Sequence, residues 1–203
     1  MLQTFTVRPT TLVLLKKLQS IEPLEPLRLV GGTALALHIG HRDSIALDLF
    51  GKHDFDHEEL LNILVENDFE VIERYTTKSI FACTCDGIKV DIVNFDLNWL
   101  HAPIIEDGIK LASMEDIAAM KLKAIAGRGS KKDFIDIYFL LGHFSLNKML
   151  EMFQKKFPNI ATLLVVKSLA YFADADNQPM PNMYIPTQWE TVRKTILDSI
   201  REL

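Results

Sequence analysis

The fold of the N-terminal half is decided by the stretch LVGGTALAL, residues 29–37. The apolar run 27–30 predicts a short strand, and residues 34–39 predict a helix that ends at Gly40, a residue type typical of the position after a helix. Gly31-Gly32-Thr33 is therefore a tight turn between a strand and a helix. Such a turn lets the backbone approach a phosphate closely, and the helix N-terminus adds N–H donors. Tight packing is the commoner reason for paired glycines, so both interpretations of the turn stand at this point.

The stretch SIALDLF, residues 44–50, lies in a predicted strand and alternates between two faces. Its odd-numbered apolar residues, including Ile45, are expected in the core, whereas Asp48 projects from the other face. Residues 88–95 repeat the arrangement and project Asp91. Two neighbouring strands with one carboxylate each are the minimum for holding Mg²⁺ between protein and phosphate oxygens. Two solvated surface carboxylates are the alternative.

The pattern of the chain changes near residue 110, and this change predicts two parts. The expected strands beyond 27–30 are residues 42–50, 69–75, 79–85 and 88–95, and the further expected helices are residues 9–18, 56–67, 113–126, 130–141, 146–156, 160–172 and 187–201. Asp86-Gly87 is a hairpin signal between two of these strands. The sequence thus predicts an α+β fold, with a mixed sheet and helices over residues 1–110 and an α-helical half over residues 111–203. A site is expected in the cleft between them.

The composition excludes several classes of protein. The 203 residues carry a net charge of −5 and are 48% hydrophobic, as in a globular protein. No apolar run reaches the roughly 18 residues that cross a membrane, and the N-terminus lacks the pattern of a signal peptide, so a cytoplasmic protein is expected. Cys83 and Cys85 are too close in a strand for an unstrained bridge and are expected to be reduced. The acidic balance argues against nucleic-acid binding through bulk positive charge. It leaves one tight basic cluster: Arg128, Lys131 and Lys132.

Three residues of the helical half could face the cleft, and each has a structural alternative. Lys121 lies on an otherwise apolar helix stripe, so it either extends to the surface or faces a cleft. Asp133 stands at the fourth position of a capping box begun by Ser130, where a carboxylate can simply cap the helix. Arg128 follows a helix end and could equally be a partner of the helix dipole. The histidines show no metal-ligand spacing, and no Ser-His-Asp or Cys-His arrangement is readable.

Together these segments resemble the AbiEii/AbiGii-type nucleotidyltransferases, a branch of the DNA polymerase β-like superfamily known as bacterial abortive-infection and toxin–antitoxin toxins. The matching blocks are residues 29–37, 40–50, 90–91, 120–125 with Arg128, and 132–138. The order and spacing of these blocks, between residues 28 and 141, are more specific than any block alone.

The resemblance implies a nucleotidyltransferase that transfers a nucleoside monophosphate from an NTP, with Mg²⁺, to an RNA (tRNA-like) or protein acceptor. It implies a cognate antitoxin as partner and no membrane. The implied catalytic residues are Asp48, Asp91, Lys121 and Asp133, of which the two strand aspartates bind the metal. The implied nucleotide-binding residues are Gly31, Gly32, Thr33, Arg42, Ser44 and Lys121. Lys121 is expected to bind phosphate, and Asp133 to act as a base or to position the lysine. The basic cluster Arg128, Lys131 and Lys132 could seat an acceptor phosphate or be a solvated helix start.

The sequence departs from the family pattern at one position. Asp-x-Asp is expected on the first site strand, and here it reads Ala46-Leu47-Asp48. Asp43 cannot substitute, because its odd offset from Ala46 puts it on the opposite strand face. Losing a metal ligand impairs nucleotidyl transfer, which depends on positioning and electrostatic stabilisation. Three explanations fit: an engineered inactivation, a degenerate enzyme, or chemistry with one metal.

The alternative function is a non-catalytic module that keeps the fold to bind nucleotide or a partner. A plain helical adaptor would leave the Gly-Gly turn and the two aspartate strands unexplained.

Overall fold

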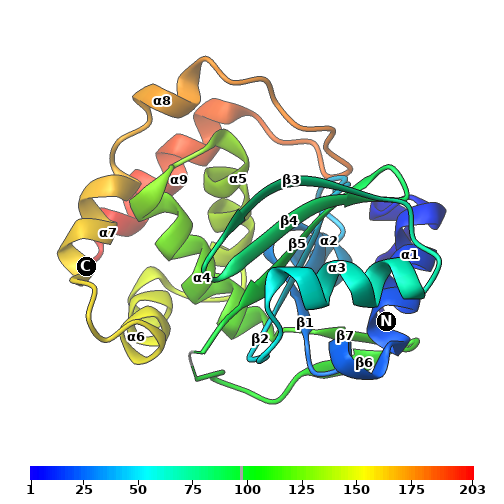
Figure 1. Ribbon diagram of the computed structural model, residues 1–203. Coiled ribbons are helices and arrows are strands. Elements are labelled where there is room, and N and C mark those ends of the chain that lie inside the picture. The colour runs from blue at the N-terminus through cyan, green and yellow to red at the C-terminus, as the bar shows by residue number, and fades with distance from the viewer. Residues whose placement is uncertain (97) are drawn as a thin grey trace.

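The structure is a computed structural model that describes residues 1–96 and 98–203. Its described strands form one seven-stranded sheet in the order β3-β4-β5-β2-β1-β7-β6 (Figure 1). The strands are β1 (Arg28–Val30), β2 (Leu47–Gly51), β3 (Val71–Thr77), β4 (Ile80–Cys85), β5 (Ile88–Asn94), β6 (Ile104–Glu106) and β7 (Ile109–Leu111). β2 runs parallel to β5, β1 runs parallel to β7, and the other pairs are antiparallel. The mixed sheet of the predicted α+β fold is confirmed.

Helices make up the rest of the described fold. They are α1 (Pro9–Ser20), α2 (Gly31–Ile39), α3 (His57–Glu66), α4 (Met114–Gly127), α5 (Lys131–Leu141), α6 (Leu146–Lys156), α7 (Thr162–Leu169), α8 (Ala173–Asp176) and α9 (Trp189–Arg201), with short 3₁₀ turns η1 (Thr4–Thr6) and η2 (Glu22–Leu24). In Figure 1, α4 to α9 gather on the left, and α1 and α3 lie on the right. Helix α4 packs against α2, α5, α6 and α7, so it joins the sheet layer to the helical half.

Local sequence explains where the helices near the site begin and end. Helix α2 starts at Gly31, directly after β1, so residues 31–33, predicted as a turn before a helix over 34–39, form its first turn. Gly31 adopts a left-handed φ of +70° that glycine tolerates without a Cβ penalty. The same helix ends at Gly40, with φ +79°, as predicted from its position. Helix α4 begins at Ser113, whose side chain accepts a hydrogen bond from the Asp116 backbone N–H.

A buried ion pair holds α6 against the start of α4. Lys156 Nζ lies 2.6 Å from Asp116 Oδ1, and both side chains are fully buried. The Asp116 carboxylate also accepts the backbone N–H groups of Leu100 and His101, at 3.0 and 3.3 Å. The pair therefore also fixes Leu100 and His101. Phe95, directly after β5, faces the site described below.

The predicted strand over residues 42–50 is too long. Strand β2 begins only at Leu47, and Ile45, expected in the core, is 54% exposed. The residues before β2 bond to other parts of the chain instead: the Ser44 N–H donates to the Thr6 carbonyl, and the Asp43 N–H donates to the Asn182 carbonyl, both at 3.0 Å. These partners are distant in sequence, so the alternating pattern could not reveal them.

Other boundaries differ in the second half. The hairpin of β6 and β7, which turns at Asp107-Gly108, was not predicted, and the expected helix 160–172 ends at Leu169 before the short α8. Strand β7 spans the predicted division near residue 110, and every element described after it is a helix. Cys83 and Cys85 are both free and buried, as expected. Within residues 1–96 and 98–203, no helix has the length and apolar character needed to span a membrane.

Candidate active site

Asp48 and Asp91 occupy one row of the sheet. They are register partners on the parallel strands β2 and β5, so both side chains leave the same face. Because neighbouring strands lie roughly 4.8 Å apart, the two carboxylates are close enough to interact. Burial, reinforced by the negative charge of Asp91, raises the pKa of Asp48 to about 6. Among the described residues, no side chain donates a hydrogen bond to Asp48, so its carboxylate is available in the cleft.

Gly31 and Gly32 are required by close packing. A Cβ at Gly31 would collide with the Asp48 carboxylate, and a Cβ at Gly32 would collide with the guanidinium of Arg42. The turn brings the start of α2 against the aspartate of β2, and the packing interpretation of the glycine pair accounts for both positions. Gly31 and Gly32 nevertheless line the cavities described below, and α2 presents its N-terminus beside them.

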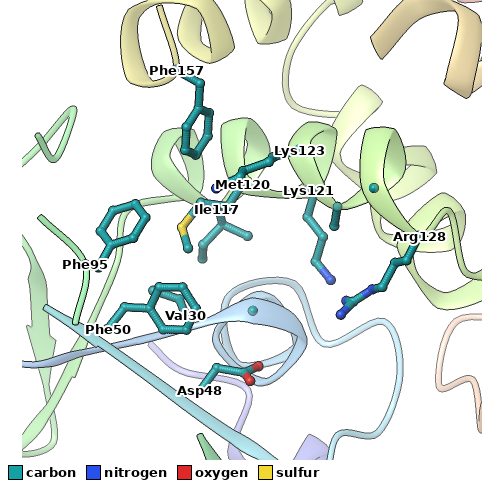
Figure 2. A pocket seen from close by; sticks show the side chains of 13 residues that line it. Val30, Asp48, Phe50, Phe95, Ile117, Met120, Lys121, Lys123, Arg128 and Phe157 are labelled. Carbon is teal, nitrogen blue, oxygen red and sulfur yellow. The ribbon is translucent and has the colours of Figure 1, made fainter. Parts of the chain in front are cut away.

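Lys121 faces the cleft. Its side chain is only 6% exposed, and its Nζ lies 2.6 Å from Asp136 Oδ2 and 3.2 Å from Asp133 Oδ1. The surface-extended alternative for this lysine is therefore wrong. Figure 2 shows its ammonium pointing across the cleft toward Asp48.

Asp136 is the centre of a buried network. Its carboxylate accepts from Arg42 Nε and Nη2 and contacts His41 Nε2, each at 2.8 Å, in addition to Lys121. Burial alone would raise the pKa of Asp136, but the charges of Lys121 and Arg42 hold it well below its usual range. Sequence reasoning matched Asp136 to the resemblance but gave it no site role. The available signal was its spacing of three residues from Asp133, which puts both carboxylates on one side of α5.

Arg42 does not reach out toward a ligand. It is buried, and its remaining Nη1 donates to the Asp43 carbonyl at 2.9 Å. The resemblance implied a position near the phosphates, and the structure shows that the Arg42 side chain binds Asp136. Its guanidinium still forms part of the cleft wall next to Gly32.

Asp133 is held by several donors. Arg128 Nε and Nη2 reach its two oxygens at 2.8 and 3.0 Å, and Ser130 Oγ donates at 2.7 Å. Burial opposes ionisation, but Lys121 and Arg128 lower the pKa of Asp133 below its usual range. Ser130 is the N-cap residue of α5, but it bonds the Asp133 side chain and makes none of the backbone contacts of a capping box. A carboxylate so strongly held in its ionised form is suited to positioning Lys121 rather than to accepting a proton.

Thr33 and Ser44 connect α2 to the segment before β2. Their hydroxyl oxygens lie 2.7 Å apart, and Thr33 Oγ1 also donates to the Ala46 carbonyl. Ala46 lies one residue before β2 and lines the same cavity as Ser44. The position that carries Asp in the family pattern is thus at the site, next to Asp48.

Two cavities meet at Asp48, Lys121 and Arg128. One, of about 550 Å³, is the more polar of the two and is called the polar cavity; it is bordered by the segment 42–46, by the start of α5 and by residues 179–182. The other, of about 320 Å³, is apolar and is shown in Figure 2. Its apolar wall is formed by Val30, Phe50, Phe95, Ile117, Met120 and Phe157. Asp48, Lys121 and Arg128 lie at one end of this apolar cavity (Figure 2), whereas Lys123 lies over the ring of Phe157.

The predicted basic cluster is divided by the structure. Arg128 and Lys132 border the polar cavity. Lys131 is buried, and its Nζ donates to the backbone carbonyls of Asp176 and Gln178. Lys131 therefore lacks the free ammonium expected of an acceptor-phosphate contact.

The donor set suits one magnesium ion. Mg²⁺ in proteins is commonly bound by one or two carboxylates together with substrate phosphates and water, so Asp48, alone or with Asp91, meets that requirement. The described residues include no group of three or more acidic, histidine or cysteine side chains placed to share a metal. Two metal ions lying roughly 4 Å apart would need more ligands than these two carboxylates provide.

Comparison with known proteins agrees with this geometry. The profile of the family described as "Nucleotidyl transferase AbiEii toxin, Type IV TA system" matches residues 13–202. A protein of Aquifex aeolicus (strain VF5), described as "Uncharacterized protein aq_aa25", is 33% identical over 196 residues, which cover 93% of each chain.

Solved structures share the fold. JHP933 from Helicobacter pylori has a TM-score of 0.55 at 19% identity, covering 97% of this chain and 92% of the other. MenT4, a nucleotidyltransferase toxin from Mycobacterium tuberculosis, has a TM-score of 0.58 at 14% identity, covering 94% and 82%. With the family profile extending over nearly the whole sequence, the chain belongs to the AbiEii nucleotidyl transferase toxin family.

Proposed function

We propose that this chain binds an NTP with Mg²⁺ in the cleft and transfers its nucleoside monophosphate to an RNA (tRNA-like) or protein acceptor, at a rate reduced by Ala46. The observation that carries the proposal is the pairing of Asp48 with Asp91 across parallel strands, opposite the buried Lys121. The type IV toxin–antitoxin description of the family supports a cognate antitoxin as a further partner.

The two cavities suggest how the nucleotide lies. Aromatic side chains provide stacking surfaces for a planar base, and the apolar cavity contains Phe50, Phe95 and Phe157. Phosphates need N–H donors and cations, and the polar cavity has Gly32 at the start of α2 together with Lys121, Arg128 and Lys132. We place the base in the apolar cavity and the phosphate chain toward the polar one, with the reacting phosphate beside Asp48.

The transfer exchanges one P–O bond for another. The oxygen of an acceptor hydroxyl forms a bond to the α-phosphorus and loses its proton to water in the open cleft. The bond from the α-phosphorus to the bridging oxygen of the β-phosphate breaks, and pyrophosphate leaves with the negative charge that develops on it. Mg²⁺ supplies charge neutralisation and orientation of the phosphate oxygens when bound. Lys121, fixed by Asp133 and Asp136, holds its ammonium toward the cleft, and Arg128 adds a second cation at the junction of the cavities. Their fixed placement stabilises charge without reorganisation.

Ala46 is the reason to expect a slow enzyme. Its methyl group stands where the family pattern has a carboxylate, at the wall of the polar cavity. The residues that surround it, including Asp48 and Lys121, keep the arrangement described above. Ala46→Asp therefore adds the missing oxygen ligand to an assembled site.

The proposal is tested by incubating the protein with each of the four labelled NTPs, Mg²⁺, cellular RNA and lysate protein. We expect Ala46→Asp to fold as the parent does and to transfer label by orders of magnitude faster, and to slow cell growth when expressed. Lys121→Ala in the Ala46→Asp background is the matched control and should abolish transfer. If the folded Ala46→Asp protein labels no RNA or protein with any NTP, nucleotidyl transfer is rejected, and nucleotide binding without turnover is the function that remains.

A further inference from the structure

An arginine that the proposed function does not use contacts the metal site. Arg74 lies on the edge strand β3, and its Nη2 donates to Asp91 Oδ1. Its Nε donates to the carbonyl of Cys83 on β4, at 3.0 Å. The side chain therefore extends from β3 across β4 to β5. The Arg74 and Asp91 side chains are 27% and 29% exposed, so the ion pair lies at the surface end of the site and is partly open to solvent.

A bulge in β3 gives Arg74 this direction. The pairing of β3 with β4 shifts between Glu73 and Tyr75, so Arg74 is the extra residue of the strand. A bulge re-aims the side chain that it carries, and bulges are frequent beside active sites. On β4, the register partner of Asp91 is Ala82, whose small side chain leaves room above the sheet for the guanidinium.

The ion pair of Arg74 with Asp91 reduces the negative charge that is available to bind a metal ion. Across the sheet, Ala82, Asp91 and Asp48 form one row of register partners. The guanidinium of Arg74 offsets the charge of Asp91, whereas no described side chain donates to Asp48. Ala46, just before β2, supplies no carboxylate, so Asp48 is the one carboxylate of this row that no described side chain binds directly.

We propose that Arg74 is a fixed cation that stands in place of a second metal ion, so that the site takes a single divalent cation, bound through Asp48. The identity of the site rests on the proposed function, but the metal-binding behaviour does not depend on turnover. Arg74 is a positioning residue in this scheme, because it acts through Asp91. Ala46 in place of the aspartate of the family pattern removes a negative charge from the site. Arg74 supplies a positive charge there, so the two features together remove the need for a second metal ion.

The test is the binding of Mn²⁺ to the nucleotide-free protein, measured by calorimetry and by the electron paramagnetic resonance signal of free Mn²⁺. The parent should bind one Mn²⁺ at this site. Arg74→Gln should bind Mn²⁺ about tenfold more tightly, because the freed Asp91 carboxylate regains the equivalent of one charge-assisted contact. Arg74→Lys keeps the cation and should stay close to the parent. Arg201→Gln, which removes an exposed ion pair with Asp198 on α9, is the matched control.

A double variant identifies Asp91 as the source of the gain. Arg74→Gln combined with Asp91→Asn removes both members of the pair, and its Mn²⁺ affinity should return to that of the parent. The proposal is overturned if folded Arg74→Gln binds Mn²⁺ as the parent does, if the gain persists without the Asp91 carboxylate, or if the parent binds two Mn²⁺ ions at the site. The stoichiometry of the parent decides the question even if Arg74→Gln does not fold. A tenfold gain in Mn²⁺ affinity for Arg74→Gln, together with no labelling of RNA or protein by folded Ala46→Asp, would reject the proposed function and leave this inference standing.

Discussion

Lys121 Nζ lies between two carboxylates of the same helix, 2.6 Å from Asp136 Oδ2 and 3.2 Å from Asp133 Oδ1. One turn of α5 thus fixes the Lys121 side chain of α4 in the cleft. The outer carboxylate, Asp133, also binds Arg128, and the inner one, Asp136, also binds Arg42. The two aspartates thus share Lys121, and each of them also binds one arginine of the site.

Asp136→Asn should destabilise the fold strongly. The variant leaves Lys121 and Arg42 buried with one fewer negative charge, and breaking a buried pair costs about 3–5 kcal/mol. Urea unfolding of parent and variant at pH 7 measures the difference. Asp198→Asn, which breaks an exposed pair with Arg201, should cost less than about 1 kcal/mol. A loss for Asp136→Asn as small as that of the control would show that the network adds no stability.

Asp48 should make stability depend on pH. Because burial and Asp91 raise its pKa from 3.8 to about 6, the folded protein keeps a proton between these pH values that the unfolded chain has lost. The free energy of unfolding therefore falls as pH rises through this window, by up to about 3 kcal/mol before solvent screening reduces it.

Asp48→Asn removes this titration. The free energy of unfolding of Asp48→Asn minus that of the parent should be small near pH 4 and rise to a plateau above pH 6. Urea titrations across that pH range measure this difference. Taking the difference between the two proteins cancels the other groups that titrate in the same window. An advantage that does not change with pH would contradict the raised pKa.

Gly31→Ala should cost more than Gly108→Ala. The two glycines have nearly the same backbone strain for an added Cβ, with φ of +70° and +74°. Beyond that shared cost, of about 1 kcal/mol or more, the Cβ at Gly31 meets the Asp48 carboxylate, whereas the Cβ at Gly108 meets no described atom within 4 Å. The difference between their unfolding free energies measures the close approach of α2 to Asp48. Equal losses would mean that Asp48 moves aside freely.

Phe50→Ala should weaken NTP binding if the base stacks in the apolar cavity. Stacking on an aromatic ring is worth about 1–3 kcal/mol per base, which is roughly tenfold in affinity or more. Phe50 borders that cavity and also packs on Phe95, so the thermal midpoint must be recorded with the affinity. Phe5→Ala, which removes an exposed ring packed on Tyr184, is the matched control. Unchanged affinity in folded Phe50→Ala would place the base elsewhere.

The alternating and helical patterns predicted most of this fold. The shared sheet face of Asp48 and Asp91 follows from two strands with the same alternation, and the end of α2 follows from Gly40. The start of α2 was predicted three residues too late, because Gly31-Gly32 is typical of a turn. The orientation of Lys121 was harder to predict, because a single lysine in an apolar helix stripe can either extend to the surface or face a cleft. Only the packing of α4 against α5 decides between them, and that contact is tertiary.

The contacts that sequence reasoning missed all depend on distant partners. Arg74 reaches Asp91 only because β3 bulges, and no local pattern distinguishes a bulged strand from a regular one here. Arg42 faces inward because Asp136, 94 positions later, offers it a buried carboxylate. Ile45 is exposed because its neighbours bond to η1 and to the loop before α9 rather than to a strand.

The bulge at Arg74 has a second effect, on how the protein avoids self-association. Strand β3 is the outermost strand on its side of the described sheet, and Ile72 and Tyr75 on it are exposed. A straight outer strand of this kind is a template on which the strands of other chains can add. The bulge bends β3 and breaks the regular spacing of its backbone groups, so a second chain finds no continuous row to pair with. One extra residue in β3 thus both directs a cation to the site and protects the sheet from aggregation.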